Sequence, residues 1–305
     1  HLTADVICRT IFSTPLAAGV SRDVFEDFTE FEQSVSQVDI FRLIFQKAWA
    51  KMPQPPGVLA ACQRIRRHLG DLVDPHLENP GAFNDIASDV IAAKDSDTGE
   101  AFTREELIDQ LGVFFLAGHE TSASALTWVF YLLAEQPTLV LRLRNELEHV
   151  VGSGPINFNH VKQLPLVRAV FRETLRLYPP ITFIPRVALE DCQIGPRKLR
   201  RGALVMVSPW TIHRHQRYWS DPDAFIPDRF LVEGESSIQE GAYIPFGVGP
   251  HTCIGAGFAQ AEAVLIIAEL VRRFDFSRAD RQSVRPAARL TTRPAQQIKL
   301  HCRRL

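Results

Sequence analysis

A glycine-rich stretch near the C-terminus contains one cysteine in a setting that suits metal chemistry. The stretch reads Tyr243-Ile-Pro-Phe-Gly-Val-Gly-Pro-His-Thr-Cys-Ile-Gly255, and an apolar run with helical spacing follows from Ala256. A thiol at the start of a helix lies near free N–H groups and the positive end of the helix dipole. Both favour the thiolate, which is the form that binds metals. Cys253 is therefore either a metal ligand or a buried structural cysteine beside a glycine turn, and for a lone cysteine the structural interpretation is the commoner one.

The glycines of this stretch predict its backbone conformation. Gly247 and Gly249 suit a turn that needs positive φ angles, or a close approach of the main chain to a flat ligand. Phe246 and Pro250 add bulk that can shield the sulfur of Cys253 from water. The stretch is therefore predicted to be a shaped loop that delivers a thiol to the start of a helix.

A second polar group stands in the middle of the longest helix that the sequence predicts. The capping box of Thr103 and Glu106 opens this helix, which runs to about Glu135. Glu120 and Thr121 interrupt its apolar positions, and a carboxylate inside an apolar helix is costly unless it is paired or used. The Thr121 hydroxyl can also bond back to a carbonyl of the preceding turn. A proton-carrying pair and a helix kink with satisfied polar groups are the two interpretations.

Opposite charges stand on another predicted helix, which follows Pro165 and runs to about Leu177. Glu173 and Arg176 are three residues apart, so they face the same side and can pair. Such pairs are common on protein surfaces, so this spacing alone does not indicate a function.

The elements that must position these groups are mainly helices. Hydrophobic spacing predicts further helices at 4–12, 22–50, 58–77, 84–93 and 139–151. Short apolar runs bounded by turn residues predict strands at 181–189, 274–276 and 297–301, and a hairpin at 199–207 with its turn at 200–202. The expected fold class is mainly α with small β-sheets, an α+β arrangement.

The composition narrows the class of protein. The 305 residues carry a formal net charge of -1, which offers no argument for nucleic acid binding, and 46% of them are hydrophobic. Five cysteines without paired spacing indicate a reducing, cytoplasmic location rather than a disulfide framework. The most apolar window, 111–134, contains His119 and Glu120 and is predicted to be a buried helix rather than a membrane span. The chain begins with His1, so we expect an N-terminal part, with any membrane anchor, to be missing.

The cysteine stretch resembles a known cofactor loop. Phe246, Gly249, Cys253 and Gly255 have the spacing Phe-x-x-Gly-x-x-x-Cys-x-Gly, which is similar to the haem-binding loop of the cytochrome P-450 family. The resemblance implies that Cys253 is the proximal ligand of the iron of haem b, where a thiolate favours O–O cleavage. His251 stands where arginine is commonest in the family, and a histidine can donate to a haem propionate with a charge that depends on pH.

The resemblance extends along the chain. Ala117-Gly-His-Glu-Thr121 is similar to the family's central helix motif, which implies that Ala117 borders the haem. It also implies that Glu120 and Thr121 are catalytic and relay protons to bound dioxygen. Arg186, in a predicted strand, stands where the family often has an arginine that binds a haem propionate. A surface arginine is its simpler alternative.

A buried network is the third implied feature. Glu173 and Arg176 resemble the family's Glu-x-x-Arg pair, and Arg229 of Pro227-Asp-Arg-Phe230 resembles the later arginine that joins the pair behind the haem. Asp228 replaces the glutamate that is frequent at its position, a minor departure. The family's Trp-x-x-x-Arg helix has no counterpart upstream, because the pattern occurs here at 210–214 alone. The expectation is therefore a single haem-binding domain over 1–305 that lacks its N-terminal part.

The resemblance implies a haem-thiolate monooxygenase that inserts one oxygen atom from O2 into a small apolar organic substrate by hydroxylation or epoxidation. Electrons would come from an external ferredoxin- or flavoprotein-type donor, and a monomer is expected. The alternatives are a peroxide-dependent haem-thiolate enzyme and a haem-binding or inactive fragment without turnover. The candidate substrate wall consists of Phe114, Ala117, Ile181, Thr182 and Phe183. Basic residues that could receive the donor, or simply form a solvated helix face, are Lys162, Arg168 and Arg172.

Overall fold

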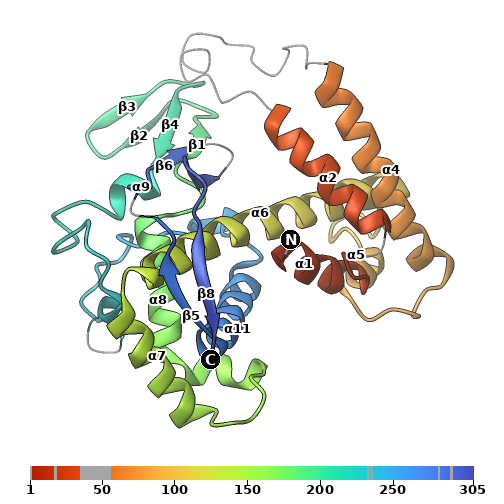
Figure 1. The fold of residues 1–305 in the computed structure, drawn as a ribbon. Helices are drawn as coiled ribbons and strands as arrows, with labels where there is room; N and C mark the ends of the chain where they lie inside the picture. Colours follow the sequence, from red (N-terminus) through yellow and green to blue (C-terminus); the bar gives the residue numbers. More distant parts are fainter. Residues whose placement is uncertain are drawn as a thin grey trace. The chain divides into compact units, whose positions relative to one another are not determined.

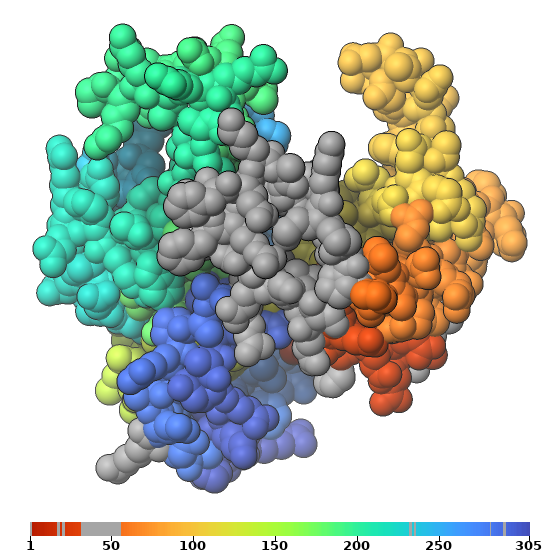
Figure 2. Space-filling view, turned by 90° about the horizontal axis from the view of Figure 1, so that it is seen from above, coloured from red at the N-terminus to blue at the C-terminus, as the bar shows by residue number. Residues whose placement is uncertain are grey.

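The computed structural model describes residues 2–16, 19–34, 56–231, 234, 236–280, 282–288 and 291–305. The remaining residues, grey in Figures 1 and 2, lie outside this description. The chain divides into two compact units, His1–Ala123 (unit 1) and Ser124–Leu305 (unit 2). The boundary falls inside one continuous helix, α6 (Arg104–Ala134), which belongs partly to each unit.

Unit 1 is built from helices whose ends follow local signals. Its elements are α1 (Leu2–Phe12), α2 (Gly19–Ser34), α4 (Pro56–Glu78), α5 (Ile86–Ala92) and the first part of α6. Asp85 caps α5, because its side chain accepts a hydrogen bond from the Ser88 N–H at 3.0 Å. The predicted capping box opens α6: the Thr103 N–H donates to Glu106 at 2.8 Å and the Glu106 N–H donates to Thr103 Oγ1 at 3.3 Å.

The described helices of unit 1 bury apolar side chains. Phe28 of α2 stacks on Phe115 of α6, with ring centroids 5.1 Å apart, and both rings are buried. The other helices, α1, α4 and α5, add fully buried apolar residues, among them Ile11, Phe12, Val73 and Ala87. The predicted helix at 22–50 is confirmed as far as Ser34, and its part at 35–50 lies outside the described residues.

Unit 2 is organised around a helical core. Helices α7 (Pro137–Val150), α8 (Pro165–Leu177) and α11 (Ala256–Arg273) pack against one another and against the second part of α6 (Figure 1). Both α7 and α8 begin with proline, which has the helical φ angle and lacks only an N–H that the first turn cannot use. Short helical turns lie between these elements: η2 (Phe158–Gln163), α9 (Pro209–Ile212), η3 (Pro227–Phe230) and η4 (Gly249–His251).

The strands of unit 2 form small antiparallel ladders. In the described part of the chain each ladder has two strands. The pairs are β1 (Ile184–Val187) with β4 (Leu204–Val207), β2 (Cys192–Ile194) with β3 (Arg197–Leu199), β5 (Phe274–Arg278) with β8 (Leu300–Arg304), and β6 (Pro286–Ala288) with β7 (Thr292–Pro294). The predicted fold class, mainly α with small sheets, is confirmed.

Two strand predictions need correction. Of the strand expected at 181–189, only the part that is β1 forms, and residues 181–183 before it are irregular. The hairpin expected at 199–207 is wrong, because the strands beside its turn belong to different ladders. The β2–β3 hairpin turns at Gly195, which has a φ of +55°, and is inserted between β1 and β4. Leu199 therefore pairs back with Cys192 instead of across the next turn.

Across the described ranges, we find no helix with the length and apolar character needed to pass through a bilayer.

Candidate functional site

The cysteine loop of unit 2 runs from Ile244 to Cys253 and has the conformation that its glycines predict. Gly247 and Gly249 both have a φ of +75°, a region that other residues adopt only with strain. Three main-chain hydrogen bonds close the loop: from the Gly247 N–H to the Ile244 carbonyl at 3.1 Å, from the Thr252 N–H to the Gly249 carbonyl at 3.0 Å and from the Cys253 N–H to the Phe246 carbonyl at 2.8 Å. The position of Cys253 is thus tied to the main chain of its own loop.

The thiol of Cys253 lies on an exposed, apolar part of this loop. Cys253 is exposed and stands two residues before Gly255, the N-cap of α11. Ile254, the next residue, is 89% exposed, and Val248, five residues earlier in the loop, is 63% exposed. Phe246 instead packs against the main core of unit 2, so one side of the loop is anchored while the thiol side is uncovered.

A buried histidine holds the start of this loop. The main-chain N–H of Ile244 donates to Nε2 of His213 at 2.8 Å, and the His213 side chain is completely buried. Burial lowers the pKa of His213 to about 4, and the nearby charge of Arg176 acts in the same direction. No role for His213 was predicted from the sequence, because its position one residue before Arg214 carries no separate signal for one.

Arg176 is the centre of the buried polar network behind the loop. Its Nε and Nη2 atoms donate to the two oxygens of Glu173 at 2.7 and 2.8 Å, and both side chains have zero exposure. Its remaining hydrogens go to main-chain carbonyls at 2.6 to 2.9 Å, those of His213, Pro222 and Ala224. A guanidinium has five N–H donors, and all five are used here.

Glu173 also binds Arg229, the third predicted member of the network. Its Oε1 atom also accepts from the Ile226 N–H at 2.8 Å and from Arg229 Nε at 3.4 Å. Arg229 donates further to the Asp221 carbonyl at 2.9 Å. The structure therefore brings together the three residues that the sequence placed in one network. Asp228, the departure from the family pattern, points elsewhere and pairs with Arg142.

In unit 1, the polar residues of α6 lie as the sequence predicts. The Thr121 hydroxyl donates to the Ala117 carbonyl at 2.6 Å, the back-bond expected for a hydroxyl residue inside a helix. Glu120 is 3% exposed, whereas Ala117 is exposed and Thr121 partly so. Gly118 faces α1, because a Cβ there would lie 2.6 Å from Cδ1 of Ile7.

Each unit contains part of the predicted substrate wall. Phe114 of unit 1 is half-buried. In unit 2, Ile181 and Phe183 are 40% and 44% exposed, and the main chain between them is held by a hydrogen bond from Ser208 Oγ to the Thr182 carbonyl at 3.2 Å. The exposed apolar side chains are suited to an apolar molecule.

A threonine that the sequence analysis missed fixes the main chain just before this segment. The Thr292 carbonyl accepts from Ser124 Oγ at 2.6 Å and from Trp128 Nε1 at 3.0 Å, both on α6. The Thr292 hydroxyl donates to the Pro179 carbonyl at 2.7 Å, and its N–H donates to the Pro180 carbonyl at 2.9 Å. Three segments of unit 2 are joined at this buried residue.

The loop residues of unit 2 fit the iron porphyrin implied by the sequence. An exposed thiol beside uncovered apolar side chains offers one metal ligand and an apolar surface for a flat ring. A Cβ at Gly249 would meet no atom within 4 Å, so the main chain there is open to close approach. Arg186 and His251 are both exposed, as side chains that bind propionates must be, and Arg186 Nη1 contacts only the adjacent Pro185 carbonyl within hydrogen-bond distance, at 2.8 Å, among the described residues.

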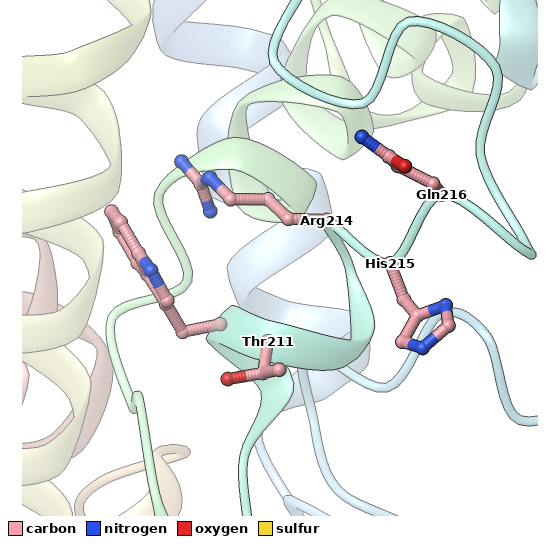
Figure 3. A pocket seen from close by; sticks show the side chains of 5 residues that line it. Thr211, Arg214, His215 and Gln216 are labelled. Carbon is pink, nitrogen blue, oxygen red and sulfur yellow. The ribbon is translucent and has the colours of Figure 1, made fainter.

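A separate open pocket lies beside α9 and is lined by Trp210, Thr211, Arg214, His215 and Gln216 (Figure 3). The Arg214 guanidinium lies over the Trp210 ring, 3.6 Å from its centroid, and burial lowers the pKa of Arg214 to about 10. The His215 ring points away from the guanidinium (Figure 3). The Trp-x-x-x-Arg pattern at 210–214 thus forms a cation–π pair between α9 and the residues just after it.

Comparisons with known proteins agree with this geometry. A family model described as Cytochrome P450 matches residues 1–301. Cyclooctatin synthase of Streptomyces melanosporofaciens is 31% identical over 304 residues, which are 95% of this chain and 63% of that protein. Cyclooctat-9-en-7-ol 5-monooxygenase of the same organism is 29% identical over 277 residues, 88% of this chain and 58% of that protein.

The fold comparison gives the same answer. The solved structure of retinoic acid bound cyanobacterial CYP120A1 matches with a TM-score of 0.88 and 25% identity, covering 100% of this chain and 68% of that one. The chain spans 63% and 58% of the two curated relatives named above. With a family model matching nearly its whole length, the chain belongs to the cytochrome P450 family.

Proposed function

We propose that this protein is a haem-thiolate monooxygenase, which inserts one oxygen atom from dioxygen into an apolar organic substrate by hydroxylation or epoxidation. Haem b, the cofactor of the family, supplies dioxygen binding and O–O cleavage when it is bound. The residues of the chain hold the cofactor, deliver protons, exclude water and orient the substrate.

The observation that carries the proposal is the loop that exposes Cys253. Its positive φ angles and its hydrogen bond from Cys253 N–H to the Phe246 carbonyl support a role in presenting a thiolate at a fixed place. We assign the iron ligand to Cys253, contacts with the porphyrin to Phe246, Gly249 and Gly255, and the propionates to Arg186 and His251. Ala117 would border the cofactor from α6.

We assign proton delivery to Thr121 and Glu120. The Thr121 hydroxyl donates to the Ala117 carbonyl, and its oxygen keeps lone pairs that can accept a further hydrogen bond. The hydroxyl can also rotate to donate to a nearby acceptor. Glu120 directly precedes Thr121 in the sequence, and its side chain is ionisable and buried. These properties support its role as the proton source.

The substrate class and the electron donor follow from the same residues. Phe114, Ile181 and Phe183 are partly exposed and apolar, which favours an apolar substrate, with Thr182 as the polar member of the wall. The family requires an electron donor, and we propose one of the ferredoxin or flavoprotein type. In the predicted basic patch, Arg172 is engaged by the rings of Phe230 and Tyr243, at 4.6 and 5.5 Å. Lys162 is exposed and Arg168 half-buried.

The ligand assignment is tested by the ferrous–CO difference spectrum of the haem-loaded protein. We expect a Soret band at the long wavelength that marks thiolate ligation, and its loss in Cys253→Ala. Cys192→Ala, at an exposed cysteine of β2, is the control and should keep the band. A band typical of histidine or thiol ligation in the unmodified protein contradicts the proposal.

The proton relay is tested by the ratio of product formed to electrons consumed. Thr121→Ala should lower this ratio by about tenfold, since a positioned proton donor contributes at least that much to a proton-dependent step. Thr127→Ala, at an exposed threonine of the same helix, should leave the ratio unchanged. Turnover with peroxide but none with dioxygen and reductant would instead identify a peroxide-dependent enzyme.

A further inference from the structure

We propose that His213 is a positioning residue for the cysteine loop: its ring holds the main chain where the loop begins and thereby sets where Cys253 is presented. This inference rests on the proposed role of Cys253 as the iron ligand. It assigns a function to a buried histidine whose side chain belongs to neither the Glu173–Arg176–Arg229 network nor the loop itself.

The contact that carries the inference is directional. Ile244 donates its main-chain N–H to Nε2 of His213 at 2.8 Å, so Nε2 is the unprotonated acceptor of a neutral ring. The other ring nitrogen, Nδ1, makes no hydrogen bond within the described residues. The hydrogen bond at Nε2 joins the ring to the first residue of the loop, and the main chain of Arg176 and Leu175 also lies close to the ring. With its low pKa, His213 keeps this acceptor at neutral pH.

His213 is itself held from two sides. Its carbonyl accepts from Arg176 Nη1 at 2.8 Å, which ties the histidine to the buried ion pair. Its ring stacks on Tyr243, with centroids 5.4 Å apart and an interplanar angle of 29°. The Tyr243 hydroxyl donates to the Arg172 carbonyl at 3.0 Å. A fixed ring can act as a reference point for the loop, whereas a mobile ring could not.

Main-chain hydrogen bonds within the loop connect Ile244 to Cys253. The Ile244 carbonyl accepts from the Gly247 N–H at 3.1 Å, and the next turn is closed by the bond from Cys253 N–H to the Phe246 carbonyl. The path from His213 to Cys253 thus runs through successive main-chain hydrogen bonds of one short loop. If the hydrogen bond between Ile244 and His213 is lost, the turns that orient the Cys253 thiol are no longer held at their first residue.

The test compares two substitutions with opposite effects on the acceptor. His213→Phe keeps a flat ring for Tyr243 and removes the acceptor, whereas His213→Gln loses the ring and keeps an acceptor at nearly the same reach. We expect the Phe variant to lower the ratio of thiolate-ligated to other haem in the ferrous–CO spectrum by about tenfold, as loss of one hydrogen bond to a buried donor would give. The Gln variant should restore most of that ratio.

A matched control lies two residues along the chain. His215 also accepts a main-chain N–H, that of Arg217 at 3.1 Å, but it is exposed. His215→Phe should leave the spectrum unchanged. A folded His213→Phe protein with the same thiolate-ligated ratio as the unmodified protein overturns the inference. If the unmodified protein itself shows no thiolate band, the proposed function fails instead, so the two failures are distinguishable.

A measurement on the unmodified protein covers the case in which the variants do not fold. The Ile244 amide of the haem-loaded protein should exchange with deuterium at least about tenfold more slowly than an unstructured amide, because it is buried and bonded to His213. This protection should be lost below the pH at which His213 takes up a proton. Exchange of Ile244 at the unstructured rate at neutral pH overturns the inference.

Discussion

Glu173 and Arg176 form a two-pronged ion pair, at 2.7 and 2.8 Å, in which neither side chain is exposed to solvent. Removing two charges from water is unfavourable, and the loss is offset only when the geometry is good and every remaining hydrogen has an acceptor. Arg176 meets this condition, because its other hydrogens go to carbonyls. The pair is therefore stable as a complete network and should respond strongly to partial disruption.

Arg176→Lys tests this relationship. A lysine has three donors on one nitrogen and cannot replace the five N–H groups of the guanidinium, so the Glu173 carboxylate is left buried and under-bonded. We expect the free energy of unfolding to fall by about 3–5 kcal/mol, measured by urea denaturation followed by circular dichroism. Arg142→Lys is the control: its pair with Asp228 is about half exposed on both sides, so a change of at most about 1 kcal/mol is expected. Equal effects of the two substitutions would contradict the account.

The shared acceptor at Thr292 predicts non-additive effects of two substitutions on α6. Ser124→Ala leaves the Thr292 carbonyl bonded to Trp128 Nε1, and Trp128→Phe leaves it bonded to Ser124 Oγ while keeping a ring against Tyr178. Only the double variant leaves a buried carbonyl without either donor. We expect urea denaturation to show a loss of stability in the double variant that exceeds the sum of the single losses by about 1–2 kcal/mol. Additive losses would show that the carbonyl finds another donor.

The buried neutral state of His213 predicts a pH dependence of stability. Its pKa is about 4 in the folded protein and 6.5 in an exposed histidine, so the unfolded chain binds the extra proton between these values. The free energy of unfolding should therefore fall as the pH drops from about 6.5 to about 4, by about 3 kcal/mol for this group. His213→Gln should remove that contribution, which pH-dependent urea denaturation of both proteins can measure. Identical pH profiles would mean that His213 is not neutralised by folding.

Local signals in the sequence predict the helices of this protein well. The capping box at Thr103 and the proline at the start of α8 act within one turn of the chain, so the first residues of α6 and α8 follow from them. The positive φ angles of Gly247 and Gly249 were also predictable, because the conformational freedom of glycine is a local property.

Features that depend on distant contacts were not predictable in this way. The pairing of Leu199 with Cys192 depends on which strands meet, and the turn residues near 200–202 do not determine that. Gly118 could be read as a weak point of its helix, but the structure gives a packing reason, the approach of Ile7 from α1. The contact of His213 was not predictable, because its partner, Ile244, lies 31 residues away along the chain.

The candidate site shows the same division. The spacing of Glu173 and Arg176 predicts a pair, whereas the number of carbonyls gathered by Arg176 emerges only once the chain has folded. The resemblance to the cytochrome P450 family supplied Arg229, which local spacing could not connect to a helix more than fifty residues before it, and the structure places it 3.4 Å from Glu173.

Arg176 binds the segment around Pro222 and Ala224 through carbonyl oxygens, which every amino acid carries. Side chains at these positions can therefore be exchanged during evolution without removing the contact, as long as the main chain keeps its path. One buried arginine can thus preserve the shape of a segment whose own residues change. Substitutions in this segment should therefore leave the support of the cysteine loop in place.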